Sequence, residues 1–390
     1  GHGPHLSTVI GGPGGRVWRE MRRALRSQEM ASRIGVLGWV SGVVSTVLGA
    51  LAFGAVLCLW FPAMLTTPAL RDVYPMEIVR TAIKIALGVA FALGVVSVLT
   101  KRRKALGLTG AGFALLATLM GGSEVAVATP VPRGNHVGLD WFLLDLFLLS
   151  AIFVPIELLF GRLREQPIFR EGWRTDLWHF GISHLLVQLT VFLTMAPAAI
   201  FFRWAVAPEV QAAVAAQPYA LQFVEVLLVA DLSQYTVHRL FHSVPWLWRF
   251  HEIHHSSRTM DWLAGSRLHL VDIVVTRGLS FVPLYVLGFA QPPVFAYVLF
   301  VSFQAVLIHA NVAWRFGPLR WVLATPQYHH WHHAVEPVDV NFAVHLPVID
   351  AIFGTLHLPG DRWPAAYGLA GRPVPDGYWA QLLFPFRARS

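Results

Sequence analysis

Histidines gather in three short stretches in the second half of this chain, and their spacing is typical of metal ligands. Eleven of the 18 histidines lie between His238 and His333. The motifs HRLFH, HEIHH and HHWHH supply eight candidate ligands, His238, His242, His251, His254, His255, His329, His332 and His333. On a helix, positions i, i+3 and i+4 share one face, so each triplet is expected to aim three imidazoles at one point.

The number of these rings indicates more than one metal ion. Neutral imidazole is the commonest biological ligand of iron, zinc and copper. His309 lies at the end of an apolar run, twenty residues before the last motif, and adds a further candidate. Eight or nine nitrogens exceed the four ligands of a tetrahedral zinc site. They suit two metal ions, each with a position left open for water, oxygen or substrate.

Polar side chains near the motifs are candidates for supporting the ligands, because metal-bound histidines usually donate their second ring nitrogen to a carboxylate or carbonyl. Asp231 lies two helical turns before His238 on the same face, with Tyr235 between them, and is the first candidate. Together with Asn341, these two are the predicted catalytic residues. Weaker supporting candidates are Glu252, Asp261, Asp272 and Asn311.

Other histidines are expected to have other roles. His330 lies off the shared face of its triplet, so we expect it to be solvated or to support a ligand. His179 and His184 lie one turn apart in an apolar run and are expected to pack between helices or to support a ligand. Histidines of the three motifs also have simpler interpretations, as interfacial hydrogen-bonding groups or as a pH sensor.

Composition indicates that a membrane positions these residues. Of the 390 residues, 55% are hydrophobic and only 13% are charged, against about 25% charged in a typical soluble domain. This excludes a soluble globular enzyme, a disordered chain and a collagen-like chain. The formal charge of +8 comes from basic loops that flank apolar runs, which argues against nucleic-acid binding. Cys58 is the single cysteine, so no disulfide framework or thiolate site is expected.

Eight apolar runs predict an all-α, polytopic membrane helix bundle. Each run is close to the ~20 residues that a helix needs to cross the hydrocarbon core. They lie at about 35–60, 79–100, 106–128, 139–160, 179–202, 219–237, 271–290 and 292–309. The third run is rich in glycine, and the seventh contains Arg277 and Pro283, so these two fit the pattern less well.

Basic loops predict the orientation of the bundle. Clusters of Arg and Lys at 16–33, 101–104 and 162–174 fall on one side of the membrane, which the positive-inside rule assigns to the cytoplasm. If 271–309 forms a helical hairpin or a pair of re-entrant helices, all three histidine motifs return to that face. The expected location is a bacterial inner membrane, or the endoplasmic reticulum of a eukaryote, with a cytoplasmic-face histidine-rich di-metal site.

The order HxxxH, HxxHH, HxxHH between apolar runs resembles the fatty acid hydroxylase / sterol desaturase superfamily. Further similarity lies in DLSQYTVHRLFH, HEIHHSSRTMDWLAGSRLHLVD, TPQYHHWHH and NFAVHLPVIDAIFGT. The resemblance covers about 139–360 and implies a membrane-embedded, O2-dependent enzyme. Such enzymes hydroxylate or desaturate lipid chains, sterols or ether lipids at a non-haem di-iron centre. The eight motif histidines match the ligands of that centre, and His309 fits an additional one.

This resemblance also sets the expected organisation and cofactors. The expected parts are a basic tail at 1–34, an accessory region of about three spans at 35–130, the catalytic domain at 139–360 and a cytoplasmic tail at 361–390. The expected cofactor is a pair of iron ions, with zinc possible in purified material. The HPGG haem signature and GxGxxG are absent from the sequence. Electrons are therefore expected from a separate electron-transfer protein or a small reductant.

Three alternatives stay open. The tail YGLAGRPVPDGYWAQLLFPF is loosely similar to the alkylglycerol monooxygenase branch, which implies a pterin-dependent ether-lipid monooxygenase. A membrane metal transporter or sensor would place its ligands near the bilayer midplane. A zinc hydrolase would be expected to carry HExxH or a carboxylate base, and HEIHH places Glu252 at a different spacing.

Overall fold

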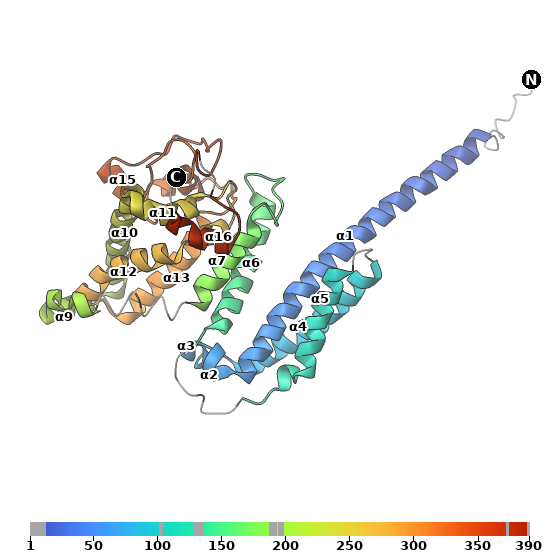
Figure 1. The fold of residues 1–390 in the computed structure, drawn as a ribbon, viewed down its shortest axis with the longest axis horizontal. Helices are drawn as coiled ribbons and strands as arrows, with labels where there is room; N and C mark the ends of the chain where they lie inside the picture. Colours follow the sequence, from blue (N-terminus) through green and yellow to red (C-terminus); the bar gives the residue numbers. More distant parts are fainter. Residues whose placement is uncertain are drawn as a thin grey trace, which may run out of the picture. The chain divides into compact units, whose positions relative to one another are not determined.

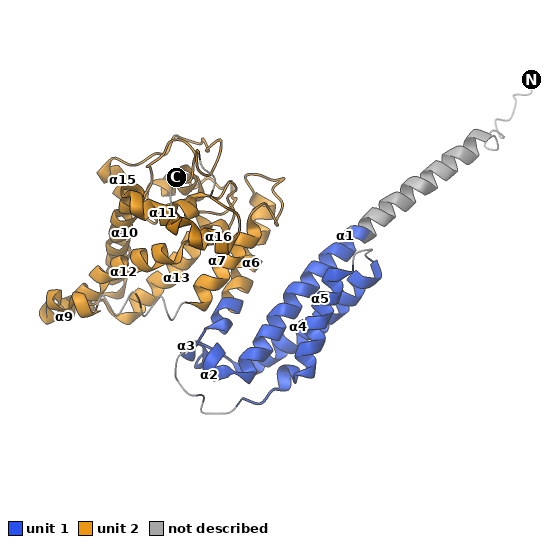
Figure 2. Cartoon of the chain, in the orientation of Figure 1, with its two compact units in different colours: residues 1–143 blue, residues 144–390 orange. Residues whose placement is uncertain are grey.

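The computed structural model describes residues 13–100, 104–127, 131, 136–186, 193, 199–371 and 374–387. The described residues form helices joined by loops, and one isolated antiparallel bridge joins Ala334 and Tyr367. The predicted all-α class is confirmed. The chain divides into two compact units, residues 1–143 and 144–390 (Figure 2).

The first unit is built from three long helices, α1 (Pro13–Trp60), α4 (Met76–Thr100) and α5 (Ala105–Leu119) (Figure 1). Short helices α2 (Pro62–Leu65), α3 (Pro68–Arg71) and η1 (Gly122–Glu124) complete it. Glycines let α4 and α5 approach closely, because a Cβ added at Gly107 would lie 2.6 Å from the Gly94 carbonyl oxygen. Ser45 Oγ also donates to Ala90 O at 2.6 Å and ties α1 to α4.

The second unit contains the remaining helices. They are α6 (Leu139–Phe160, which begins in the first unit), α7 (Trp173–Leu185), α9 (Pro208–Ala215), α10 (Tyr219–Ser243), α11 (Pro245–His255), α12 (Leu270–Leu287), α13 (Gln291–Leu307), α14 (Pro326–His332), α15 (Pro347–Phe353) and α16 (Tyr378–Leu383). Short 3-10 turns are η2 (Arg203–Ala205), η3 (Ala264–Ser266), η4 (Gly317–Trp321) and η5 (Phe384–Phe386). The segment between the apolar runs 179–202 and 219–237 thus includes a helix, α9.

Six described helices are long and apolar enough to cross a membrane, which agrees with a multi-pass membrane protein. They are Leu37–Trp60 of α1, α4, Ala105–Glu124, α6, α10 and α12. The eighth predicted run, α13, has 17 residues and falls short of this length. Gly288 ends α12 in the left-handed conformation at φ 71°, and prolines at the start of α13 allow no earlier beginning.

The fifth predicted run, 179–202, is described only in part. Its first residues belong to α7, which has 13 residues and buries Asp176 and His179. Residues 187–192 and 194–198 lie outside the described part of the chain, as does the basic stretch 101–103. The orientation of the bundle stays a prediction.

Helix α10 is the centre of the second unit, and α11, α12 and α13 all pack on it (Figure 1). Val226 and Ala230 of α10 form a core with Leu284 of α12 and Tyr297 of α13. An extended residue, Val244, separates α10 from α11 and turns the chain sharply. The last turns of α10 and the whole of α11 are thereby brought together.

The C-terminal segment packs against the second unit, as expected for a packed tail. The side-chain oxygen of Gln381 in α16 accepts a hydrogen bond from His179 Nε2 at 2.9 Å. Arg249 of α11 donates to the carbonyl of Arg387 at 2.6 Å. The tail therefore covers α7 and α11, the helix that carries the second histidine motif.

Candidate metal centre

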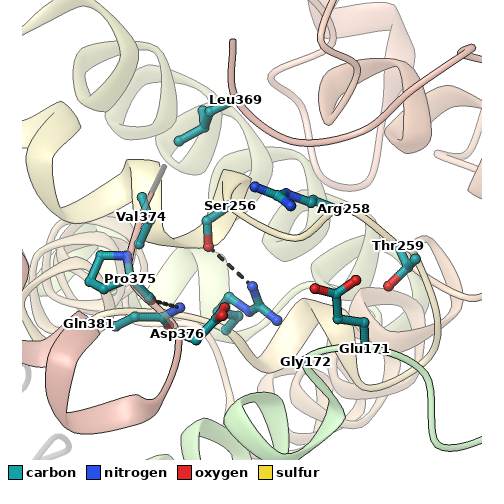
Figure 3. A pocket seen from close by; sticks show the side chains of 11 residues that line it. Glu171, Gly172, Ser256, Arg258, Thr259, Leu369, Val374, Pro375, Asp376 and Gln381 are labelled. Carbon is teal, nitrogen blue, oxygen red and sulfur yellow. Dashed lines mark hydrogen bonds between the residues drawn. The ribbon is translucent and has the colours of Figure 1, made fainter. Parts of the chain in front are cut away.

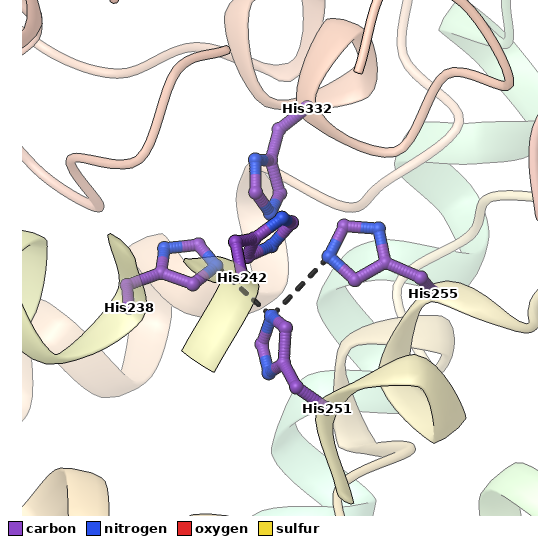
Figure 4. A group of neighbouring side chains, drawn as sticks. All are labelled: His238, His242, His251, His255 and His332. Carbon is purple, nitrogen blue, oxygen red and sulfur yellow. Dashed lines mark hydrogen bonds between the residues drawn. The ribbon is translucent and has the colours of Figure 1, made fainter. Parts of the chain in front are cut away.

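All nine predicted ligands meet in two groups of ring nitrogens. The first group consists of His238, His242, His251, His255 and His332 (Figure 4). The second group consists of His254, His309, His329 and His333. Within each group the candidate ligand atoms all lie within 4.8 Å of one another. Helices α10, α11 and α14 and the end of α13 contribute these side chains.

Each histidine triplet serves both groups, so the expectation that a triplet aims at one point is wrong. His251 and His255 of α11 face the first group, and His254 faces the second. In the third motif, His329 and His333 face the second group, and His332 faces the first. A helix turns about 100° per residue. Neighbours such as His254 and His255 therefore diverge enough to reach two separate points.

Tautomers in the first group follow from the oxygen atoms around it. His238 Nδ1 donates to Phe342 O at 2.7 Å, and His251 Nδ1 donates to the Asp272 carboxylate at 2.7 Å. With the proton on Nδ1, each Nε2 carries a lone pair. These two Nε2 atoms face each other at 3.0 Å. Two facing lone pairs repel, and a metal ion between them turns the repulsion into coordination.

Further nitrogens of the first group lack any other partner. His332 Nδ1 donates to Val340 O at 2.8 Å, which leaves a lone pair on its Nε2. Nε2 of His332 and Nε2 of His242 are buried and have no hydrogen-bond partner among the described residues. Buried polar atoms are normally satisfied, so these atoms fit the requirements of a bound cation.

The second group is arranged in the same way. His309 Nδ1 donates to Ala305 O at 2.6 Å, and His254 Nδ1 donates to Arg267 O at 3.2 Å. His309 Nε2 therefore carries a lone pair, and it lies 3.0 Å from His329 Nε2. His333 Nε2 lies 3.1 Å from the same His329 atom. Three ring nitrogens thus surround one point.

The two groups adjoin each other. The rings of His255 and His333 are stacked with centroids 4.5 Å apart, and those of His329 and His332 are stacked at 5.3 Å. Burial, with neighbouring imidazoles as a further cause, lowers the pKa of His255 and His329 well below the ordinary value. Both rings are therefore neutral at neutral pH, which is the form that binds metals.

Asp231 has a different partner from the predicted one. Its carboxylate accepts the backbone N–H groups of Val344, His345 and Leu346 at 2.8, 3.1 and 2.6 Å. The prediction that it accepts from a histidine ring is wrong, because two helical turns carry Asp231 past the metal groups to the loop behind them. Asp231 instead fixes the loop whose Phe342 carbonyl holds His238.

Tyr235 and Asn341 also bond to the scaffold rather than to the histidine rings. Tyr235 Oη lies 3.0 Å from Thr355 Oγ1 and stays outside both groups. Asn341 adopts φ 58°, a left-handed conformation that asparagine tolerates. Its amide donates to Tyr328 O and His357 O, both at 2.8 Å. These contacts hold the residues on either side of α14 in place, and a catalytic role for either side chain stays a prediction.

Sequence reasoning missed the main supporting atoms because most are backbone carbonyls. The carbonyls of Arg267, Ala305, Val340 and Phe342 accept from ligand rings, and a carbonyl carries no residue-type signal. Asp272, a weaker candidate, is the carboxylate that holds His251. Its signal was an acidic residue in the first turn of an apolar helix, a costly placement without a partner.

The remaining histidines divide as follows. His330 is buried, so the expectation of solvation is wrong, and its support for a ligand is observed instead. Its Nε2 donates to His309 O at 3.2 Å, and its Nδ1 accepts from Tyr367 Oη at 2.8 Å. His179 and His184 lie in neither group. His184 bonds to Asp145 at 2.7 Å, which ties α7 to α6.

A buried network of charged side chains supports the backbone next to the second group. Arg170 contacts Asp176 and Asp261, both at 2.6 Å, and Arg267 Nε donates to Asp176 at 2.5 Å. Two guanidiniums and two carboxylates balance each other, as buried charges require. The Arg267 carbonyl accepts from His254, so this network fixes the backbone that orients a candidate ligand.

Fold and site together define a multi-pass membrane protein with two adjoining all-imidazole groups. Residues 223–355 match the fatty acid hydroxylase family. This match confirms the resemblance noted from the motifs. No solved structure matches the chain significantly.

Curated relatives are lipid oxygenases by name. The chain is 37% identical to ornithine lipid hydroxylase OlsE of Rhizobium tropici over 172 residues, which are 43% of this chain and 51% of that protein. It is 33% identical to alkylglycerol monooxygenase of Xenopus tropicalis over 146 residues, 36% of this chain and 31% of the relative. The human alkylglycerol monooxygenase is 32% identical over 145 residues, 36% of this chain and 32% of the relative. The matches thus span about half the length of the first relative and under a third of the others.

Proposed function

We propose that this protein is an O2-dependent oxidoreductase that hydroxylates or desaturates a membrane lipid. Two iron ions bind, one in each histidine group, with the nine histidines as their ligands. The observation that carries this proposal is the pair of adjoining groups in which buried ring nitrogens face one another at hydrogen-bond distance. Neutral imidazole is the ligand that this metal chemistry requires.

Chemistry of the donor set favours oxidation over hydrolysis. Among the described residues neither group includes a carboxylate, so a general base for water attack is missing from the ligand sphere. An apolar lipid chain offers no group that a Lewis acid can polarise. When bound, the iron pair supplies the activation of O2 that attack on a C–H bond needs.

The chain itself holds the ligands and keeps the site dry. The carbonyls of Phe342 and Ala305 and the carboxylate of Asp272 fix the orientation of three rings. His251 and His333 are 5% and 1% exposed, so bulk water has little access to the groups. Such fixed, shielded ligands allow one C–H bond to be presented reproducibly to the metals.

The substrate class rests on the membrane and on the relatives. Six apolar helices, three of them in the part of the chain that carries the histidines, support a bilayer location, and ornithine lipid hydroxylase carries a lipid in its name. Similarity to alkylglycerol monooxygenases supports a second candidate, monooxygenation of an ether lipid. Electrons come from a separate protein or small reductant. The basic loops support a site that faces the cytoplasm, and we propose a bacterial inner membrane or, in a eukaryote, the endoplasmic reticulum.

The test is lipid analysis under 18O2 with and without the active protein. A mass gain from 18O identifies hydroxylation, and a loss of two hydrogens identifies desaturation. His254→Ala and His332→Ala each remove one ligand, one from each group, and are expected to lose metal and lipid-dependent O2 uptake. His357→Ala, which lies outside both groups, is the matched control.

Three results would overturn the proposal. The first is full metal content and O2 uptake in both ligand variants. The second is a lipid product that forms equally under nitrogen, which would indicate a hydrolase. The third is metal movement without any lipid product, which would indicate a transporter. Zinc in a purified sample decides nothing, because imidazole binds Zn²⁺ more tightly than Fe²⁺.

A further inference from the structure

Figure 3 shows a polar pocket of about 430 Å³ whose lining includes residues that adjoin the second histidine motif in the chain. Its wall includes Ser256, which directly follows the ligand candidate His255 in the chain. Another wall residue is Arg267, whose carbonyl accepts from His254. The volume falls in the range of small-molecule sites. A molecule in this pocket therefore lies next to the backbone that orients the proposed metal ligands.

Charges of both signs line this pocket. Arg258 and Arg267 are cationic, and Glu171 and Asp376 are anionic. Within the described part of the chain, Glu171, Arg258 and Asp376 form no ion pair. Arg267 is 5% exposed, and its Nη1 donates to Ser256 Oγ at 3.2 Å. Because Arg267 is already paired with Asp176, the charges that this pocket leaves without an ion pair among the described residues are Arg258, Glu171 and Asp376.

We propose that this pocket binds the zwitterionic headgroup of the lipid substrate, a phosphate or carboxylate joined to an ammonium group by a short linker. The Arg258 guanidinium binds the anionic end, and the carboxylates of Glu171 and Asp376 bind the ammonium. Leu369, Val374 and Pro375 supply apolar lining for the methylenes between them. An ion of one sign would leave the opposite pair of side chains unmatched.

A flat heteroaromatic reductant fits this pocket less well. Among the residues that the structure describes, the lining contains no aromatic side chain, so a planar ring would find no stacking partner there. The assignment to the substrate rests on the proposed function, but the binding itself does not. It can be measured on the full-length protein without metal, in an uncharged detergent.

The experiment compares three soluble probes by calorimetry: glycerophosphoethanolamine, inorganic phosphate and ethanolamine. Glycerophosphoethanolamine is expected to bind saturably, about tenfold or more tightly than either half alone. Arg258→Gln and Asp376→Asn are each expected to weaken its binding roughly tenfold, the effect of losing one hydrogen bond to a charged group. Both side chains are exposed, so the fold should persist, and thermal unfolding checks it.

Matched controls lie in the loop before α7. Arg164→Gln and Glu165→Gln change the net charge equally, and both residues are exposed outside the pocket. They are expected to leave binding unchanged. Equal loss in the controls, unchanged binding in the pocket variants, or phosphate binding as tightly as the whole probe would each overturn the proposal.

Nanodiscs distinguish a lipid headgroup from a free solute. Phosphatidylethanolamine nanodiscs are expected to displace the soluble probe, and phosphatidylglycerol nanodiscs are not. If neither displaces it, the pocket binds a free zwitterion and the headgroup assignment falls. If the soluble probe does not bind but the protein still oxidises lipid, only the headgroup-binding proposal is refuted. If the soluble probe binds but the protein oxidises no lipid, only the proposed function is refuted.

Discussion

Gly265 is a sensitive point of the second histidine group, and its replacement by alanine tests the geometry directly. A Cβ at this position would lie 2.7 Å from His309 Nδ1, 2.9 Å from Cγ and 3.0 Å from Cε1. Ordinary contact begins at 3.4 Å, so the ring must move by about 0.7 Å. The clash involves ring atoms near the Cβ of His309, so a simple rotation of the far end does not relieve it.

The ring has little freedom to move. Its Nδ1 donates to Ala305 O at 2.6 Å, and its Nε2 lies 3.0 Å from His329 Nε2. Metal–ligand distances hold to about ±0.2 Å in real sites, so a shift several times larger removes His309 as a ligand. Overpacking also costs roughly 1–3 kcal/mol, partly offset by about 0.5–1 kcal/mol gained when glycine becomes alanine.

The assay is metal content per chain with thermal unfolding of the same samples. Gly265→Ala is expected to lower the bound metal from two ions toward one, and to lower stability by about 1–2 kcal/mol. Gly112→Ala is the control, because a Cβ there meets nothing within 4 Å. A Gly265→Ala protein with both metals, unchanged stability and unchanged O2 uptake would refute the geometry of the second group.

Three further predictions concern the supporting atoms and the acid stability. Asp272→Asn weakens the hydrogen-bond acceptor of His251, so the metal affinity of the first group should fall 10–100-fold. A chelator competition measures this affinity, and an unchanged value would contradict the supporting role of Asp272. Asp231→Asn should loosen the loop at 344–346 and lower the unfolding temperature, because one amide oxygen replaces a carboxylate that accepts three N–H groups; equal unfolding temperatures would contradict it. Burial lowers the pKa of His345 to about 3. The unfolded chain binds this proton below about pH 6.5 and the folded chain does not, so stability should fall by at least about 2 kcal/mol between pH 7 and pH 5, and a flat stability profile would exclude this.

Much of the fold was predictable because membrane insertion depends on local composition. A helix in lipid satisfies its own backbone, so apolar runs such as 79–100 and 139–160 indicate their structure without tertiary contacts. Apolar runs predicted spans wrongly where the length of the helix was marginal. Gly288 and the prolines after it shorten α13, and the run predicted at 179–202 begins inside α7, a helix of 13 residues that starts earlier and buries the charge-paired Asp176.

The candidate ligands were predictable for a related reason. Metal binding needs particular residue types at helical spacing, and both are visible in one dimension. The assignment of each ligand to one of the two groups was not predictable. His254 and His332 are drawn into opposite groups from their own triplets, and that depends on how α11 and α14 pack against each other.

The sequence by itself determined that this is a helical membrane protein with nine histidines suited to two metals, because hydropathy and ligand identity are properties of the residues. Tertiary structure decided which ring joins which group, which carbonyls fix the tautomers, and that Asp231 anchors a loop instead of a ligand. Those outcomes depend on distances between segments far apart in the chain, such as Asp231 and Leu346 at 2.6 Å. No local pattern encodes such a distance, because it is set by packing of the whole unit.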